Sequence, residues 1–399
     1  MIGSRPPQAF NRRLFGGAHA ARSLGWSVVD LLLAWHLHAR MGLTGTQTGW
    51  LLFAFLLLGG TATFLVGLAF SRYRARGALV VRVQLPATIA TAALLGIQFS
   101  TASIPIAVCA GLAFRLAYAV QDVAQNMLAS LLPADAADAF RYARLRVILS
   151  AVTRCIVVGG FALALPVGMT VMLVPVGFAM VVSAISLRKL VFPARPDIVA
   201  APWRVGDIMP SGLPILLVAW AIAASLLPTL NRLLIFAPAI DGLNRSGAWL
   251  LGGFCLGSVI GPLLRDYVER SAVMAMVAAS GLAIILPIPF QSSASWPVAG
   301  AVVHGMAVSI IGVQLWTATS RIAMHDTRHG RSSDGVVFGS VILTIHLASA
   351  AGMLVLGPLI EGFEAGRPGI ALAALTLTFA GALLITAIGV SERRAPAAA

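Results

Sequence analysis

Residues 46–70 read TQTGWLLFAFLLLGGTATFLVGLAF, a run that contains no charged side chain. A helix needs about 20 predominantly apolar residues to cross the hydrocarbon core of a bilayer. Similar runs recur along the 399 residues of the chain, of which 59% are hydrophobic and only 11% are charged. Membrane β-strands would alternate apolar and polar residues, and these runs do not. We therefore predict an all-α integral membrane protein.

The apolar runs form two sets, separated by a polar stretch rich in proline and arginine. We expect about twelve transmembrane helices, six on each side of this linker. The predicted units are an N-terminal six-helix bundle at residues 1–190, a cytoplasmic linker at 191–209 and a C-terminal six-helix bundle at 210–399. The expected spans are residues 14–38, 46–70, 78–98, 102–131, 144–166, 169–190, 210–237, 246–265, 271–290, 296–321, 335–360 and 369–390.

Lysines and arginines lie mainly between the apolar runs, on one predicted side of the membrane. Cations near helix ends stay on the cytoplasmic side. Placing the N-terminus inside collects most of them in inner loops, and it assigns Arg141, Arg144 and Arg146 to one of these loops. We therefore predict cytoplasmic termini and a multi-pass protein of a bacterial inner membrane. The same distribution argues against a nucleic-acid partner, since that needs basic residues gathered on a water-facing surface.

A repeated pattern relates the two predicted halves. Gly67–Arg76, GLAFSRYRAR, aligns with Gly261–Arg270, GPLLRDYVER, and keeps the glycine, the tyrosine and the last arginine. At the same spacing, Val147–Ser150, VILS, aligns with Val341–Thr344, VILT. Two similar halves joined by a linker are typical of secondary transporters, which bind their solute between the halves near the middle of the membrane.

The loop after the second span resembles the signature of the major facilitator superfamily at this place. That signature is a Gly, an Asp-Arg pair, a second Gly and further basic residues; Gly67, Arg72 and Arg76 fill the first glycine and two basic positions. Ser71 stands where the acid is expected. In the family this loop holds the two halves in one conformation. The second half has its own version of this conformational motif, with Gly261, Asp266 and Arg270.

Leu112–Arg115, LAFR, is similar to the start of a pattern in the fourth helix of proton-coupled antiporters of this family. The resemblance implies alternating access, with first and fourth helices that line the solute cavity. It also implies proton-coupled export of a drug or a siderophore-like metabolite by a monomer.

Two acids, Asp30 and Asp122, lie deep in the predicted spans. An ionisable residue inside a membrane is costly unless it is paired or hydrated, and it usually marks function. At a rise of about 1.5 Å per residue, Arg22 and Asp122 fall at similar depths, and so do Asp30 and Arg115. We therefore expect these two ion pairs. In the functional interpretation Asp30 is reversibly protonated and Arg115 is its partner; in the alternative, both pairs are fixed struts between helices.

Other polar and aromatic residues at similar depth complete the predicted substrate cavity. Arg154 has no evident acid of its own, so it either shares Asp122 or faces the solute. The arginines outnumber the acids, which favours an anionic solute over a lipophilic cation. The residues assigned to the cavity are Arg22, Trp26, Asp122, Asn126, Arg154, Gln314, Trp316 and His346.

The first functional hypothesis is proton-coupled export of a small polar or anionic molecule, such as a siderophore-like carboxylate or a drug. The second is import of a similar solute by proton symport. A non-transporting receptor or a membrane enzyme is the alternative from another class, although no nucleophile, base and orienting group occur together. There is no nucleotide-binding signature, and Cys109, Cys155 and Cys255 lack metal-ligand spacing, so neither a cofactor nor a metal is expected. The cysteines are interpreted as small core residues.

Overall fold

The computed structural model describes residues 8–72, 76–164, 169–192, 213–221, 244–264, 295–328 and 333–365. Within these ranges every regular element is a helix. The N-terminal helices are α1 (Gln8–Trp35), η1 (His36–Arg40), α2 (Gly45–Ser71), α3 (Arg76–Ser100), α4 (Ile104–Leu131), α5 (Ala136–Ala164), α6 (Thr170–Ser186) and η2 (Leu187–Lys189). The C-terminal helices are a stretch at residues 213–221, α8 (Asn244–Leu264), α10 (Ser295–Arg328) and α11 (Asp334–Glu364).

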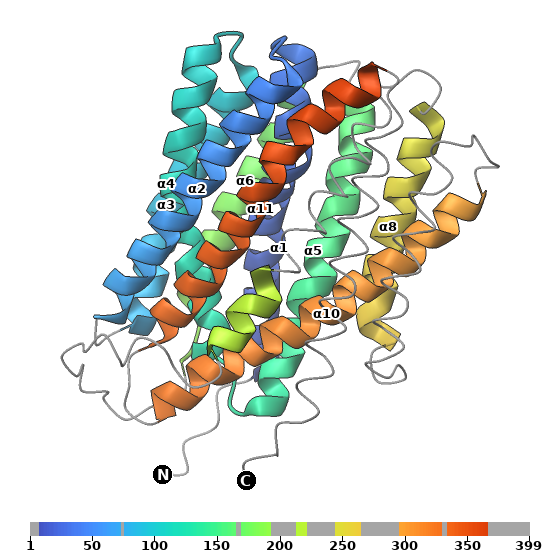
Figure 1. The fold of residues 1–399 in the computed structure, drawn as a ribbon. Helices are drawn as coiled ribbons and strands as arrows, with labels where there is room; N and C mark the ends of the chain where they lie inside the picture. The colour runs from blue at the N-terminus through green and yellow to red at the C-terminus, as the bar shows by residue number, and fades with distance from the viewer. Residues whose placement is uncertain are drawn as a thin grey trace, which may run out of the picture.

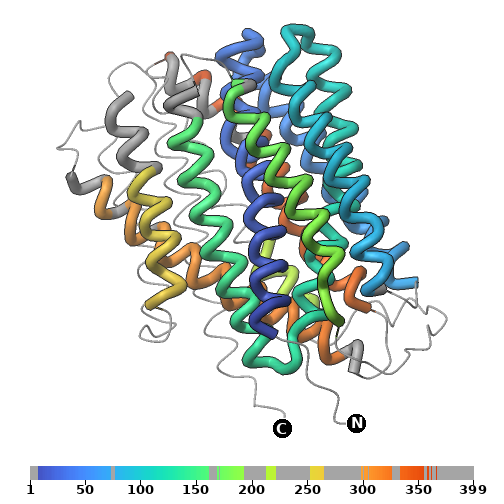
Figure 2. Tube along the Cα trace, turned by 180° about the vertical axis from the view of Figure 1, so that it is seen from behind, coloured from blue at the N-terminus to red at the C-terminus, as the bar shows by residue number. Residues whose placement is uncertain are grey.

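Six described segments are long and apolar enough to cross a membrane. They are Gly45–Ser71, Gly77–Ser100, Ile104–Leu131, Val171–Lys189, Ala301–His325 and Asp334–Leu354. Helices α1 and α5 have similar lengths and lie in the same bundle, but charged side chains such as Arg22 and Arg154 make them less apolar (Figures 1 and 2). The predicted all-α fold is confirmed for the described residues, six of whose segments have the length and apolar character of membrane spans. The predicted spans 271–290 and 369–390 lie outside the described residues, so the count of about twelve, the two-bundle division and the cytoplasmic termini stay predictions.

Helix α5 begins two turns earlier than the sequence analysis predicted. Its N-terminus is capped by Asp135, whose Oδ1 accepts the backbone N–H of Asp138 at 2.7 Å. An Asp at this place satisfies an amide that the helix itself cannot pair. Because of this early start, Arg141, Arg144 and Arg146 lie on the helix and not in a loop. The loop assignment was therefore wrong, and its consequence for the site is large.

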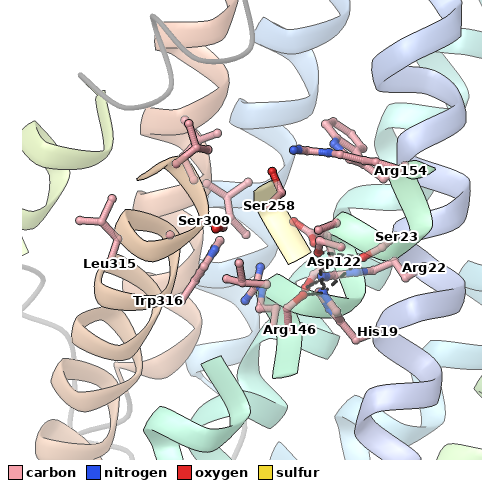
Figure 3. Close-up of a pocket in the computed structure, with 18 of the residues that line it drawn as sticks. His19, Arg22, Ser23, Asp122, Arg146, Arg154, Ser258, Ser309, Leu315 and Trp316 are labelled. Atoms are coloured by element: carbon pink, nitrogen blue, oxygen red, sulfur yellow. Dashed lines mark hydrogen bonds and ion pairs between the residues drawn. The ribbon is translucent and has the colours of Figure 1, made fainter. Parts of the chain in front are cut away.

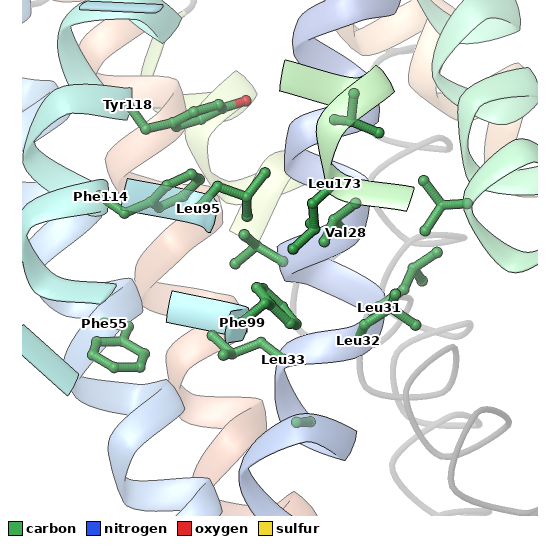
Figure 4. Packing of buried hydrophobic residues seen from close by; sticks show 14 of the residues in the cluster. Val28, Leu31, Leu32, Leu33, Phe55, Leu95, Phe99, Phe114, Tyr118 and Leu173 are labelled. Atoms are coloured by element: carbon green, nitrogen blue, oxygen red, sulfur yellow. The ribbon is translucent and has the colours of Figure 1, made fainter. Parts of the chain in front are cut away.

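The N-terminal helices pack around an apolar core (Figure 4). Val28 and Leu32 of α1, Phe55 of α2, Phe99 of α3 and Phe114 of α4 are buried there. In lipid such a core is held by close van der Waals packing, because the surrounding lipid tails are as apolar as the core. This packing fixes α1 and α4 relative to each other, and these two helices carry the charged residues of the site.

Helices α2 and α11 lie side by side along their length, through glycines (Figure 1). A Cβ added at Gly45 would meet the carbonyl oxygen of Gly357 at 2.7 Å, and one added at Gly49 would meet that of Met353 at 2.6 Å. At the other end, a Cβ on Gly67 would overlap the carbonyl oxygen of Gly335. Small residues let membrane helices approach backbone to backbone. We call this contact the α2–α11 seam.

Each helix of the seam caps the first turn of the other. The backbone N–H of Thr46, at the start of α2, donates to Oε1 of Glu361 at 2.8 Å. The backbone N–H of Val336, at the start of α11, donates to Oγ of Ser71 at 3.1 Å. These amides have no partner within their own helices. Ser71, which stands where the family signature has an acid, therefore uses its hydroxyl oxygen to bond the opposite helix.

The other residues of the conformational motif are described only in part. Gly261 packs against α10, where a Cβ would overlap the carbonyl oxygen of Met306. Arg72 is exposed at the end of α2. The side chain of Arg76 and the residues Asp266 and Arg270 lie outside the described part of the chain, so their role stays a prediction.

Candidate functional site

A cavity of about 280 Å³ lies between the N-terminal and the C-terminal helices (Figure 3). Its described walls come from α1, α4 and α5 on one side and from residue 220, α8, α10 and α11 on the other. Six of the predicted cavity residues line it: Arg22, Trp26, Asp122, Arg154, Trp316 and His346. The two remaining predictions, Asn126 and Gln314, are not among its described lining residues.

Arg22 of α1 and Asp122 of α4 form a buried ion pair through Nη1 and Oδ1. The pairing predicted from their matched depths is therefore observed. Nη1 also donates to the backbone oxygen of Asp122 at 3.3 Å and to Oδ1 of Asn126 at 3.4 Å. Asn126 thus sits behind the ion pair and supports it from α4. Removing one partner of such a pair would leave the other charge buried and uncompensated.

His19, one turn before Arg22, extends this network to α5. Its Nδ1 lies 3.1 Å from Nη2 of Arg22. A guanidinium can only donate hydrogen bonds, so Nδ1 is the acceptor and the proton lies on Nε2. Nε2 then donates to Oγ of Ser150 at 2.9 Å and to the backbone oxygen of Arg146 at 3.1 Å. His19 was not among the residues predicted for the cavity, although its position three residues before Arg22 places it on the same helical face.

Arg146 reaches across the cavity from α5 to the C-terminal helices. Its Cζ lies 3.3 Å from the centroid of the Trp316 ring on α10, a cation–π contact. The ring of Trp220 lies 4.7 Å from that of Trp316, inclined by 59°. Figure 3 shows the Arg146 side chain between the Asp122 group and Trp316. Arg146, assigned to an inner loop from sequence, is therefore a buried residue of the cavity.

Asp30 forms an ion pair that was not predicted from its sequence position. Its Oδ2 lies 4.0 Å from Nη2 of Arg154 on α5. The guanidinium of Arg115 lies 4.9 Å from the centroid of the Trp26 ring. Depth alone did not indicate this contact, because depth does not say which neighbouring helix a side chain faces. The Asp30–Arg115 pair stays a prediction, and Arg154 both pairs with Asp30 and lines the cavity.

Trp26 makes a second aromatic contact between the N-terminal and the C-terminal helices. Its ring stacks on Tyr118 of α4 at 4.9 Å and on His346 of α11 at 5.5 Å. His346 also contacts the seam, because a Cβ added at Gly60 would lie 2.8 Å from its Cβ. The predicted residues Trp26 and His346 are thus brought together where the cavity meets the α2–α11 seam.

Two cysteines meet on the side of the cavity opposite the seam. The side chains of Cys155 on α5 and Cys255 on α8 interact with each other. Cys255 is buried and Cys155 is partly exposed, whereas Cys109 is exposed on α4. The interpretation of all three as core residues therefore fails for Cys109. Cys155 and Cys255 join an N-terminal helix to a C-terminal one.

The charges of the described lining are unbalanced. Three arginines, Arg22, Arg146 and Arg154, face the cavity with one carboxylate, Asp122. Two of these arginines have a carboxylate partner, since Arg22 pairs with Asp122 and Arg154 with Asp30. The rest of the described lining is made mostly of aromatic, apolar and hydroxyl side chains. Such a cavity is suited to a small solute that carries negative charge.

No family model matches the chain, and no curated protein matches its sequence. Solved structures share its fold at low sequence identity. The human organic anion transporter MFSD10 is 14% identical, with a TM-score of 0.64 over 96% of this chain and 100% of that chain. The nucleoside transporter NupG is 12% identical, with a TM-score of 0.64 over 94% of this chain and 99% of that chain. The E. coli fucose:proton symporter FucP is 13% identical, with a TM-score of 0.57 over 95% of this chain and 98% of that chain.

These likenesses establish the fold. The chain shares the fold of these two transporters and this symporter over nearly its whole length. The three solved structures are named as two transporters and a proton symporter.

Proposed function

We propose that this chain is a secondary active transporter of a small organic anion, working by alternating access around the cavity. The observation that carries the proposal is a cavity between the N-terminal and the C-terminal helices with three arginines and one carboxylate in its described lining. A solute held there contacts both sets of helices, so their relative movement can expose it to either side of the membrane. The fold shared with three transporters supports the same function.

The favoured direction is proton-coupled export, with a siderophore-like carboxylate or a drug as cargo, across a bacterial inner membrane by a monomer. One of the solved structures is named as an organic anion transporter, which fits the charge of the cavity. Import by proton symport is the second candidate, because another is named as a proton symporter. The two directions differ in which way protons move when solute is added.

Asp30 is the proposed site of proton coupling. Its partner Arg154 lines the cavity, so a bound anion competes with Asp30 for the same guanidinium. Once the arginine is drawn to the solute, the Asp30 carboxylate loses its compensating charge and binds a proton more readily. Arg115, first expected as the partner, holds the ring of Trp26 and supports the cavity wall. Exchange of a proton for the anion then follows from competition at Arg154.

The test is proton movement in proteoliposomes that contain the parent or Asp30→Asn, with a panel of carboxylates and lipophilic drugs. We expect a carboxylate to move protons with the parent and not with Asp30→Asn. Asp135→Asn is the matched control, because Asn still caps α5 and Asp135 lies outside the cavity. Proton movement by Asp30→Asn at the rate of the parent would make Asp30 a strut and end the coupling proposal.

A further inference from the structure

Arg146 differs from the other two arginines of the cavity in its partners. Within the described residues it has no carboxylate at ion-pair distance, and its guanidinium contacts the Trp316 ring at 3.3 Å. Arg22 and Arg154 each have an acid. Arg146 is therefore the arginine of the described cavity that a solute can neutralise without displacing a described carboxylate.

Burial makes this charge a strong binding group. Arg146 is only 7% exposed, and it lines the cavity. A buried cation is costly unless it is compensated, and a cation–π contact compensates it only in part. A guanidinium also presents a planar fork of donors that matches a carboxylate with two parallel hydrogen bonds. A carboxylate that reaches Arg146 thus gains a charge-assisted contact away from bulk water.

Two indole rings lie beside this cation. Trp316 and Trp220 are 4.7 Å apart and inclined by 59°, and both line the cavity. Aromatic rings attract other aromatic rings in offset or edge-to-face arrangements at such distances. The neighbouring wall is apolar, with Val147, Ile311 and Leu315. A flat ring attached to the carboxylate would find a matching surface next to Arg146.

The size and charge of the site restrict the solute further. At about 280 Å³ the cavity is at the small end of ligand pockets. A second carboxylate on the same solute would approach either Asp122, whose partner Arg22 is already engaged, or Arg154, which already has Asp30 beside it. Like charges at close range disfavour this. The site therefore selects for one negative charge.

We propose that Arg146, Trp316 and Trp220 form a binding subsite for small aromatic monocarboxylates. This inference rests on the proposed function, since it names the solute class of the same cavity. Arg146 belongs to the N-terminal helices and Trp316 to the C-terminal ones, so a solute in this subsite touches both. Occupancy of the subsite then changes the contact between the two sets of helices.

The test is a binding panel with the full chain in lipid nanodiscs, measured by titration calorimetry. The probes are benzoate, its neutral analogue benzamide, the non-planar cyclohexanecarboxylate and the dianion phthalate. We expect benzoate to bind at least tenfold more tightly than benzamide, which lacks the charge for the hydrogen bond to Arg146. It should also bind at least tenfold more tightly than phthalate, whose second carboxylate meets like charge, and several-fold more tightly than cyclohexanecarboxylate, which has no ring to stack. No binding of benzoate, or equal binding of benzoate and benzamide, would overturn the subsite.

Variants assign the two parts of the recognition. Arg146→Met is expected to weaken benzoate at least tenfold and leave benzamide unchanged, whereas Trp316→Leu should remove the preference for benzoate over cyclohexanecarboxylate. The matched control is Arg141→Met, an exposed arginine on the same helix, with benzoate binding like the parent. Arg146→Lys keeps the charge without the fork and should bind benzoate at intermediate strength, which covers the case in which Arg146→Met fails to fold. Parent-like benzoate affinity in a folded Arg146 variant would refute the assignment.

Transport separates this inference from the proposed function. If the parent protein transports another solute and Arg146→Met transports it with unchanged kinetics, the proposed transport function stands and the subsite is refuted. If the parent protein binds benzoate through Arg146 but moves no solute in proteoliposomes, the subsite stands and the proposed transport function is refuted.

Discussion

The α2–α11 seam and the cavity are two contacts between the same two sets of helices, and different groups make them. In the seam, glycines bring backbone against backbone, as where Gly49 approaches the carbonyl of Met353. Across the cavity, long side chains make the contact, as where Arg146 meets Trp316. A solute cannot replace a backbone contact, but it can replace a guanidinium or an indole ring. The seam therefore governs whether the helices assemble, and the cavity governs what they carry.

The two contacts meet at His346. Its ring stacks on Trp26, which lines the cavity, while its Cβ packs against Gly60 of the seam. A change in the cavity that moves Trp26 is therefore felt at the seam. This gives the difference between the regions a testable form: a loss at the cavity can be repaired by changing the partner side chain, and a loss at the seam cannot.

The largest effect is expected at the ion pair of the cavity. Arg22→Met leaves Asp122 buried without its partner, and we expect a loss of about 3–5 kcal/mol in the free energy of unfolding. Adding Asp122→Leu should restore most of that stability, because two apolar groups no longer need a partner. Denaturant unfolding of the single and double variants measures both values, with transport assayed alongside. If the double variant is as unstable as Arg22→Met, a loss at the cavity cannot be repaired by a second side-chain change, and the cavity does not differ from the seam in this respect.

The next effect is expected at the seam. Gly67→Ala places a Cβ against the carbonyl oxygen of Gly335, and we expect a loss of about 1–3 kcal/mol that no side-chain change repairs. Gly96→Ala is the matched control, since a Cβ there meets no atom within 4 Å, and it should be neutral or slightly stabilising. Thermal unfolding in detergent compares the two. Equal stability of both variants would show that the seam does not need its glycines.

The smallest effect is expected at the cap between the two helices. Ser71→Ala removes the acceptor for the N–H of Val336 and should cost about 1 kcal/mol. Ser71→Asp should instead gain a few tenths of a kcal/mol, because a negative charge is favourable at a helix N-terminus. Ser186→Ala is the control, since Ser186 makes the same kind of bond to the preceding turn without reaching another helix. The melting temperature should be highest with Asp at position 71, lower with Ser and lowest with Ala. Equal melting temperatures would show that the cap does not contribute to stability.

The all-α fold could be predicted from the sequence because the apolar runs are long and nearly free of charged residues. Arg22 and Asp122 could be paired from sequence, since depth along two facing helices was enough. The contact between Asp30 and Arg154 could not be predicted, because depth does not say which neighbouring helix a side chain faces. The miss at Arg146 has another cause. An arginine close to a predicted helix end was taken as a loop residue, whereas Asp135 starts the helix two turns earlier and carries Arg146 into the cavity.

Alternating access requires the N-terminal and the C-terminal helices to separate beside the cavity, and the most direct test is to bond them there. Cys155 and Cys255 interact between α5 and α8 and can be oxidised to a disulfide in a Cys109→Ser background, with Cys255→Ser as the control. The account predicts that oxidation stops transport of the solute found in the proteoliposome panel, that a reductant restores it, and that the control is unaffected. If the cross-linked protein, verified by mass spectrometry, transports at the rate of the reduced protein, the helices do not need to part at this point and alternating access around the cavity is contradicted.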